Sequence, residues 1–277
     1  MSYVLEHKSQ RRPAPPKPMR LWNGERLAGN AILAFWLASF VFLAWWLVAS
    51  WDSEFFNRYS GRYINGVLVT LGLVALSLIL GAVLSVPIAF MRMSKNKLLN
   101  KIAFGYIYFF RGTPLITQLF LVYYGLGSFR AELESVGLWG FFREAWNCAL
   151  FAFSLNTAAY QAEILRGAIE SVPKGQWEGA KALGLNKFQI YLKIITPQAL
   201  LVALRPYGNE VILMLKASAI VSIVTVFDLM GETRRAFSKS FDFQTYIYAA
   251  ILYLMIVEVL RNFIDFVEKR ITKHLKR

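Results

Sequence analysis

Two groups of polar residues interrupt apolar stretches of the chain at spacings that suit ligand binding. The segment Arg111-Gly112-Thr113-Pro114 combines a positive charge and a hydroxyl with two residues that loosen a helix and free backbone carbonyls. Gln118 follows Arg111 by seven residues, so both lie on one helical face. Interrupted helices of this kind bind polar ligands where they line a water-filled cavity. The alternative is that Arg111 pins the end of a neighbouring helix through its five donors.

The second group is Asn156, Tyr160 and Glu163, whose spacings of four and three residues place them in one helical stripe. A carboxylate beside a phenol can hold an ammonium or guanidinium group by charge-assisted hydrogen bonds. The alternative is an internal ion pair of Glu163 with Arg111 or Lys216. Small neighbouring residues predict the close approach of another helix, namely Ala158, Ala159 and Ala162.

A third polar face contains Gln198, Arg205, Asn209 and Lys216, which are separated by seven, four and seven residues. Lys216-Ala217-Ser218 ends this polar part. The pattern is equally typical of a polar path between helices and of a helix that lies partly at an interface.

The elements that carry these residues belong to a strongly apolar chain. Of its 277 residues, 56% are apolar and 17% are charged, and the formal net charge is +14. Residues 31–51 and 63–91 contain no Asp, Glu, Lys or Arg, and crossing a bilayer needs about 20 residues. These stretches exclude a basic soluble protein such as a nucleic-acid-binding domain. The sequence therefore predicts an all-α membrane protein.

Hydropathy predicts six membrane spans, over residues 30–51, 64–91, 102–126, 146–166, 199–227 and 244–266. Arg205, Glu210 and Lys216 interrupt the fifth span, so a broken or in-plane helix is the alternative there. The segments 1–29, 92–101, 166–193 and 269–277 hold 20 basic and 4 acidic residues, whereas the segments 52–62, 127–145 and 228–243 hold 7 basic and 8 acidic ones. The positive-inside rule then predicts both termini in the cytoplasm.

Cysteine and histidine, which often act in catalysis, are rare in this sequence. Cys148 is the only cysteine, and His7 and His274 lie in polar tails, which excludes a disulfide framework and disfavours a histidine-based catalytic centre. A stand-alone secondary carrier or channel is the alternative class of membrane protein. Such proteins usually contain internal repeats, and this sequence shows none.

Residues 171–197 form a long connector on the predicted cytoplasmic side. A short helical piece over residues 176–183 stops at Gly184, and a second piece runs from Asn186 to Pro197. A rigid helical knuckle of this kind suits docking onto a cytoplasmic partner. An amphipathic surface helix is the alternative.

This connector resembles the EAA motif (E-A-A-x3-G-x9-I-x-L-P) of permease subunits in bacterial ABC importers. The matching residues are Glu178-Gly179-Ala180, Gly184, Ile194 and Pro197. Gly179 replaces the middle alanine of the motif and Thr196 replaces its leucine, and the helix-glycine-helix pattern is retained.

Further segments are similar to polar amino acid uptake permeases, in particular to the M-type subunit of histidine, lysine-arginine-ornithine or opine systems. They are FRGTPL (110–115), LNTAAYQAEILRGAI (155–169) with SVPKG (171–175), and NEVILMLKASAI (209–220). The resemblance implies the transmembrane domain of a type I ABC importer. Its five-helix permease core is expected over residues 63–268 with a coupling loop at 171–197, an added N-terminal helix at 30–51, and basic cytoplasmic tails at 1–29 and 269–277.

Such a permease implies partners: a paralogous permease subunit that completes a heterodimer, two copies of an ATP-binding subunit, a periplasmic substrate-binding protein and membrane lipid, with no nucleic acid. The chain contains no G-x-x-x-x-G-K-[ST] loop, so ATP and Mg are expected in the partner ATPase and no cofactor is expected in this chain. ATPase coupling is expected at Gly175, Gln176, Trp177, Glu178, Gly179, Ala180, Lys181, Ala182, Leu183, Gly184 and Leu185.

The resemblance places Arg111, Thr113, Tyr160 and Glu163 near a substrate cavity, and the polar faces add Gln118, Asn156, Lys216 and Ser218 as candidate substrate contacts. Import across the bacterial inner membrane is expected to proceed by alternating access, driven by ATP hydrolysis in the partner subunit. The chain itself is therefore expected to be no enzyme. The expected substrates are polar amino acids, basic ones in particular, or opine-type derivatives.

Overall fold

The structure is a computed structural model, and it describes residues 24–50 and 53–275. These residues form α-helices, short π-helical and 3₁₀ segments and the turns that join them, which confirms the all-helical prediction. The chain divides into two compact units, Met1–Ser53 and Glu54–Arg277. Most of the predicted tail 1–29 and the last two residues of the predicted tail 269–277 lie outside the described residues.

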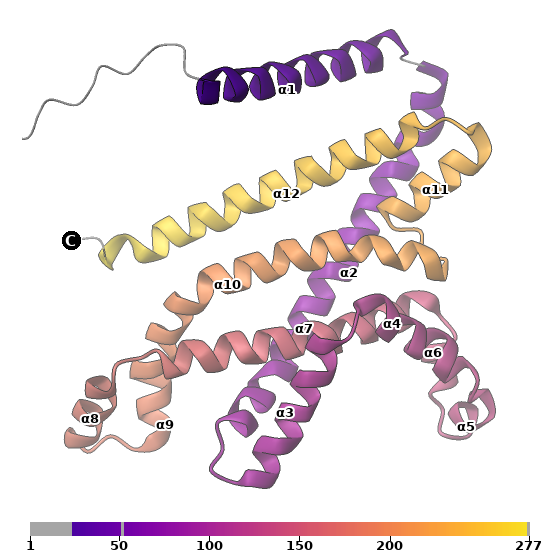
Figure 1. The fold of residues 1–277 in the computed structure, drawn as a ribbon. Helices are drawn as coiled ribbons and strands as arrows, with labels where there is room; N and C mark the ends of the chain where they lie inside the picture. Colours follow the sequence, from indigo (N-terminus) through magenta and orange to yellow (C-terminus); the bar gives the residue numbers. More distant parts are fainter. Residues whose placement is uncertain (1–23, 51–52, 276–277) are drawn as a thin grey trace, which may run out of the picture. The chain divides into compact units, whose positions relative to one another are not determined.

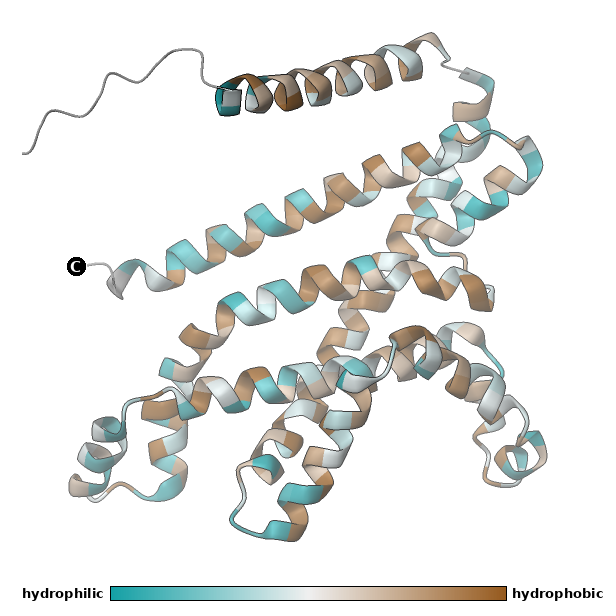
Figure 2. Cartoon of the chain, viewed as in Figure 1, coloured by the Kyte–Doolittle hydropathy of each residue, from teal (hydrophilic) through white to brown (hydrophobic). Residues whose placement is uncertain are grey.

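The first unit contains α1 (Gly24–Ala49), a helix of 26 residues. It matches the predicted span 30–51 and begins six residues earlier, with Glu25 in the first turn, where a carboxylate stabilises the positive end of the helix dipole. None of its residues is buried, and Figure 2 shows hydrophobic residues along most of its length. A helix that is apolar on all sides is typical of a membrane span.

The remaining helices lie in the second unit, except for Ser53, the first residue of α2. They are α2 (Ser53–Arg92), α3 (Lys97–Gly112), α4 (Leu115–Phe120), α5 (Arg130–Ser135), α6 (Trp139–Phe142), α7 (Ala145–Glu170), α8 (Lys174–Ala182), α9 (Lys187–Ile190), α10 (Thr196–Ala217), α11 (Leu229–Ser240) and α12 (Gln244–Ile271). Figure 1 shows α7, α10 and α12 as long neighbouring helices, with α2 crossing them.

Helix α2 is 11 residues longer at its N-terminal end than the predicted span 64–91. Tyr59 and Tyr63 explain the difference, because both are buried in a cluster with residues of α11 and α12. The hydroxyl of Tyr63 also donates to the carbonyl of Thr245 at 3.0 Å. Tertiary packing therefore continues the helix into the segment that hydropathy assigns to an outer loop.

The predicted break at residues 111–114 is confirmed. Helix α3 ends at Gly112, and Thr113 and Pro114 adopt extended backbone before α4 begins. Pro114 has no N–H to donate to the preceding turn and disfavours helical backbone at Thr113, so it favours a break at this point. The predicted span 102–126 is therefore two helices, of which α4 continues into a π-helical turn at Leu121–Gly125.

The predicted fifth span, 199–227, overlaps a longer helical run, Lys187–Val224, which begins 12 residues earlier and ends three residues earlier. This run consists of α9, a π-helical turn at Tyr191–Ile195, α10 and a 3₁₀ segment at Ser218–Val224. Pro206 lies inside α10 without ending it. The polar residues of this segment thus lie on a helix and not in a loop.

Four helical runs in the described residues are long and apolar enough to cross a membrane: α1, α2, Lys187–Val224 and α12. The predicted spans 102–126 and 146–166 do not meet that criterion. The break divides the first of them, and α7, which matches the second, carries polar side chains along its middle, including Asn156, Gln161 and Glu163.

Helix α7 packs against α3 and α4 and against α10, while α12 packs against α10 and α11. Helix α2 crosses α7 at Gly81, where a Cβ atom would collide with the side chain of Thr157 and approach the amide nitrogen of Ala158 to 3.3 Å. The small residues predicted to admit a neighbouring helix, Ala158, Ala159 and Ala162, are all fully buried. Close helix packing therefore depends on the small side chains of both helices.

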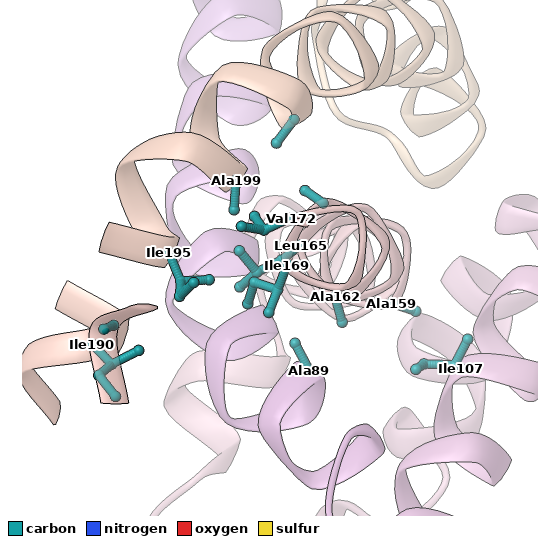
Figure 3. Close-up of a cluster of buried hydrophobic side chains, with 13 residues drawn as sticks. Ala89, Ile107, Ala159, Ala162, Leu165, Ile169, Val172, Ile190, Ile195 and Ala199 are labelled. Carbon is teal, nitrogen blue, oxygen red and sulfur yellow. The ribbon is translucent and has the colours of Figure 1, made fainter. Parts of the chain in front are cut away.

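One cluster of buried apolar side chains joins the connector of residues 171–197 to the helices. Figure 3 shows Ala89 of α2, Ile169 of α7 and Ala199 of α10 converging in this cluster. Ala180 of α8 and Ile190 of α9 belong to the same cluster. The connector is thus packed against the end of α7 and does not extend freely from it.

Candidate functional site

The break between α3 and α4 is held by hydrogen bonds from two amide side chains. Gln118 Nε2 donates to the Phe110 carbonyl at 2.9 Å, to the Thr113 carbonyl at 3.1 Å and to Thr113 Oγ1 at 2.8 Å. Asn156 Nδ2 of α7 donates to the same Phe110 carbonyl at 2.9 Å and to Gln118 Oε1 at 3.0 Å. These bonds satisfy the carbonyl groups that the break frees.

Gln118 and Asn156 are only 3% and 6% exposed, and Gln118 uses both ends of its amide within the chain. Thr113 Oγ1 also donates to the Phe109 carbonyl at 2.8 Å. These three predicted contact residues therefore brace the interrupted helix against α7. Arg111, in the last turn of α3, is thereby held at the edge of the break.

Glu163 on α7 lies among three guanidinium groups. Arg166 contacts both carboxylate oxygens, with Nη2 at 2.8 Å from Oε2 and Nε at 3.0 Å from Oε1. Arg92 Nε lies 3.9 Å from Oε1, and Arg111 Nη1 lies 4.0 Å from Oε2. The last two are beyond hydrogen-bond range, so Arg166 is the close partner.

A pocket of about 290 Å³ opens beside this cluster. It is lined by Arg92, Phe104, Ile107, Tyr108, Arg111, Gly112 and Glu163. Two aromatic rings support its guanidinium groups: Arg92 lies over Phe104 at 5.2 Å, and Arg111 lies over Tyr160 at 5.1 Å. Cation–π contacts of this kind orient an arginine without using its hydrogen-bond donors.

Besides its contact with Phe104, Arg92 is hydrogen-bonded to Asn100. Its Nη1 donates to Asn100 Oδ1 at 2.9 Å, and Asn100 Nδ2 in turn donates to the Arg92 carbonyl. Its Nε is buried and has no hydrogen-bond partner among the described residues. A buried donor without a partner is costly, so this atom marks a place where an acceptor would be favourable.

Lys216 and Ser218 do not join this cluster. Ser218 is fully buried and donates to the Leu215 carbonyl at 2.7 Å. Lys216 lines a different, mainly apolar pocket of about 580 Å³, together with Ala219, Met230, Tyr246, Ala250, Tyr253, Leu254 and Val257. That pocket shares no residue with the one beside Glu163, so the structure separates the eight predicted contacts into two places.

Sequence reasoning missed two partners of Glu163. Arg166 was detectable, because Glu163, Arg166 and Glu170 follow each other by three and four residues, the spacing of helical ion pairs. Arg92 lies on α2, and no local pattern connects it to Glu163. A third missed contact joins Glu210 of α10 to α7, where the hydroxyl of Thr157 donates to Oε1 at 2.8 Å.

The predicted knuckle is present in the connector. Helix α8 ends in a Schellman motif: Leu185 N donates to the Ala180 carbonyl at 3.3 Å and Gly184 N to the Lys181 carbonyl at 2.9 Å. Gly184 has a φ of +71°, which glycine adopts readily. Asn186 then begins α9 with a capping box that includes Gln189.

The exposed and buried sides of the knuckle differ in character. Ala180 is 2% exposed, and Trp177 packs edge-on against Tyr191 with ring centroids 5.1 Å apart. Glu178 and Lys181 are exposed, and Leu183 is 78% exposed. The knuckle thus presents charged groups and one large apolar side chain away from the core.

The described residues contain no group of three or more His, Cys, Asp and Glu side chains that could hold a metal ion. The cluster around Glu163 offers charged groups and hydrogen-bond donors to a ligand.

Known proteins with similar sequences or structures are components of transport systems. The sequence model of the family described as binding-protein-dependent transport system inner membrane component matches residues 78–273. The chain is 41% identical over 216 residues to the nopaline transport system permease protein NocM of Agrobacterium fabrum, which covers 78% of this chain and 90% of that protein. It is 41% identical over 217 residues to the histidine/lysine/arginine/ornithine transport system permease protein HisM of Escherichia coli K12, which covers 78% of this chain and 91% of that protein.

Among solved structures, a crystal structure of an amino acid ABC transporter with histidines matches with a TM-score of 0.71 at 34% sequence identity. The match covers 80% of this chain and 99% of that one. Helix α1 lies before the residues that the family model matches. From residue 78 onward, the chain belongs by its sequence to the family of binding-protein-dependent transport system inner membrane components.

Proposed function

We propose that this chain is a membrane-spanning permease subunit of an ATP-driven importer of polar amino acids, in particular basic amino acids or their opine-type derivatives. The observation that carries the proposal is the match of residues 78–273 to the family, together with 41% identity to permeases named for nopaline and for histidine, lysine, arginine and ornithine. The partners would be a paralogous permease, two ATP-binding subunits and a periplasmic substrate-binding protein.

In this proposal the chain crosses the inner membrane six times, with both termini in the cytoplasm. Helix α1 is the added span, and α2 to α12 supply the permease core. The asymmetric distribution of basic residues supports this topology. Cysteine labelling tests it: a membrane-impermeant maleimide should label Ser135→Cys in intact cells, and Lys95→Cys only after permeabilisation. Cys148 is fully buried and is replaced by alanine as a precaution. Labelling of Lys95→Cys in intact cells would contradict the topology.

The pocket beside Glu163 is the proposed substrate cavity. Arg111, Tyr160 and Glu163 form or support its polar wall, whereas Thr113, Gln118 and Asn156 shape the break next to it. Lys216 and Ser218 belong to a separate region and would meet the substrate at another stage of transport. Alternating access would then expose this cavity to each side in turn.

The knuckle over residues 175–185 is the proposed docking point of the ATP-binding subunit. Its packing into the same cluster as α7 gives a mechanical route between docking and the cavity, because Glu170 ends α7 and α8 begins four residues later, at Lys174. Interfaces with exposed charges and a protruding apolar anchor suit a folded protein partner. Glu178→Lys should therefore weaken ATPase co-purification while membrane insertion is retained.

Reconstitution tests the proposed function directly. Proteoliposomes that contain this chain, its sister permease, the ATPase and the binding protein should accumulate radiolabelled L-arginine only when ATP is supplied. Liposomes that contain the chain alone are the control. Uptake by the chain alone, independent of ATP, would support the stand-alone carrier and overturn the importer.

A further inference from the structure

We propose that the turn between α2 and α3 binds the headgroup of an anionic phospholipid through Lys95, Lys97 and Lys101. The inference goes beyond the proposed function, because it concerns a membrane lipid and not the transported ligand. It uses one part of that proposal, namely that α2 and α3 lie in a membrane. The segment 92–101 holds four basic residues and no acidic one, so its charge is complementary to that of an anionic headgroup.

The three lysines of this turn carry charges that no carboxylate of the chain neutralises. All three are exposed, and none of them makes an ion pair within the described residues. Arg92, the fourth basic residue of the segment, differs from them, because it donates to Asn100 and lies near Glu163. Exposed arginines elsewhere, such as Arg130 and Arg143, pair with a neighbouring carboxylate. The ammonium groups of the turn are thus available to an anionic ligand.

Exposed apolar side chains lie directly beside the lysines. Leu98 and Ile102, four residues apart on α3, are 66% and 54% exposed, and Phe109, seven residues further on the same face, is 45% exposed. Lys101 is the last charged residue before an uncharged stretch, 102–110. Lysines that precede an exposed apolar helix face are typical of the boundary between the hydrocarbon core and the headgroups. The order of residues along α3 therefore places the three ammonium groups at headgroup level.

The backbone of the turn is held in place by side-chain hydrogen bonds. Asn96 caps α3, because its side chain accepts from the Leu98 N–H at 2.9 Å, and the Ser94 hydroxyl accepts from the Asn96 N–H at 3.1 Å. Asn100 joins α3 to the end of α2: its Oδ1 accepts from Arg92 Nη1 at 2.9 Å, and its Nδ2 donates to the Arg92 carbonyl. Binding therefore orders only the lysine side chains and not the backbone that carries them.

The combination of charge and apolar surface favours a phospholipid over a soluble anion. A lipid phosphate contacts the ammonium groups while its acyl chains cover Leu98 and Ile102, whereas a soluble anion leaves both side chains in water. Each lysine near an anionic membrane surface contributes roughly fivefold to binding. The competing occupant is an acidic segment of a partner protein, and the test separates the two.

The test measures which lipid lies next to the turn. Leu98→Cys, in a Cys148→Ala background, is labelled with bimane, and the complex with the sister permease and the ATPase is reconstituted into liposomes. Quenching by doxyl-labelled phosphatidylglycerol is compared with quenching by doxyl-labelled phosphatidylcholine, which carries no net charge. We expect phosphatidylglycerol to associate at least about fivefold more strongly, and this preference to fall as salt is added. The triple variant Lys95→Gln/Lys97→Gln/Lys101→Gln should show a preference of about one.

The matched control is Lys269→Gln/Arg270→Gln/Lys273→Gln, which removes three exposed basic groups at and just beyond the end of α12. Because it loses the same total charge, it should leave the phosphatidylglycerol preference at the Leu98→Cys probe unchanged. Recovery of the sister permease and the ATPase with each variant verifies assembly. If the triple lysine variant does not assemble, the three single glutamine variants replace it, and each should lower the preference at least about twofold.

Three outcomes would overturn the lipid site. They are equal quenching by the two lipids, an equal loss of preference in both triple variants, and a probe that neither lipid quenches, which would show that protein covers the turn. None of these outcomes bears on ATP-driven uptake of L-arginine, which decides the proposed function separately. Loss of that uptake, with the lipid preference retained, would overturn the importer and leave the lipid site standing.

Discussion

The guanidinium of Arg166 contacts both oxygens of Glu163, with Nη2–Oε2 at 2.8 Å and Nε–Oε1 at 3.0 Å, and its third nitrogen lies 2.6 Å from Glu170. Glu163, Arg166 and Glu170 thus form a row of ion pairs along the last turns of α7. The row begins beside the pocket at Glu163 and ends at Glu170, four residues before α8 begins at Lys174. A change in the pocket can therefore reach the connector through one helix.

The first prediction concerns this pair. Arg166→Gln removes the close partner of Glu163 and should lower the stability of the assembled complex by about 1–3 kcal/mol, since a half-buried carboxylate loses its charge-assisted bonds. Differential scanning fluorimetry of the purified complex measures the shift in melting temperature. Arg143→Gln is the control, because its pair with Glu144 is exposed and should contribute less than about 1 kcal/mol. Equal shifts for both variants would contradict the prediction.

The second prediction concerns two glycines of the connector. Gly184 has a φ of +71°, so Gly184→Ala should destabilise the end of α8 by about 1–2 kcal/mol, whereas Gly179→Ala within α8 should stabilise it by about 0.5–1 kcal/mol. An added Cβ would meet no atom within 4 Å at either position, so the effect comes from the backbone alone. Amide hydrogen exchange of α8 should become faster in the first variant and slower in the second. Changes of the same sign would show that packing, and not backbone conformation, governs this turn.

The third prediction concerns the brace of the interrupted helix. Asn156→Ala removes the donor to the partly buried Phe110 carbonyl and the partner of the buried Gln118 Oε1, and should cost about 1–3 kcal/mol. Asn262→Ala, at an exposed amide that bonds Glu258 within α12, should stay within about 0.5 kcal/mol. Thermal unfolding of the complexes in detergent compares the two variants. A stable Asn156→Ala protein would mean that the break needs no support from α7.

The fourth prediction concerns Asp228, which precedes α11 outside the predicted spans. It is fully buried, and its Oδ1 accepts from the Gly231 N–H at 2.8 Å. Burial raises the pKa of the Asp228 carboxyl from 3.8 to about 6, although the hydrogen bond from Gly231 opposes the rise. The neutral form is therefore favoured by folding. Its contribution to stability, about 3 kcal/mol, is complete below pH 4 and is lost as pH rises through about 6.

Asp228→Asn isolates this effect, because asparagine still caps the helix but does not titrate. The melting temperature of the complex should fall more between pH 5 and 7.5 in the wild type than in the variant. Parallel pH profiles of the two proteins would assign the pH dependence to other groups.

Local chemistry made several features predictable from the sequence. Pro114 lacks an N–H and Gly184 tolerates a positive φ, so the break after α3 and the turn after α8 follow from one or two residues each. The start of α9 is predictable in the same local way, because the Asn186 side chain accepts from the Gln189 N–H and caps the helix. Helix ends that depend on packing were not predictable: α2 begins 11 residues early because Tyr59 and Tyr63 are buried against other helices.

The sequence by itself determined that the chain is helical and apolar, where its polar residues recur on helix faces, and which family it resembles, because these signals lie within a few residues of each other or in composition. Only the tertiary structure decided which of the eight candidate contacts lie together. It paired Glu163 with Arg166, brought Arg92 from a distant helix to within 3.9 Å of it, and left Lys216 in another pocket. Contacts between distant residues depend on where helices cross. The crossing of α2 and α7 at Gly81 is set by packing between segments that are far apart in the sequence.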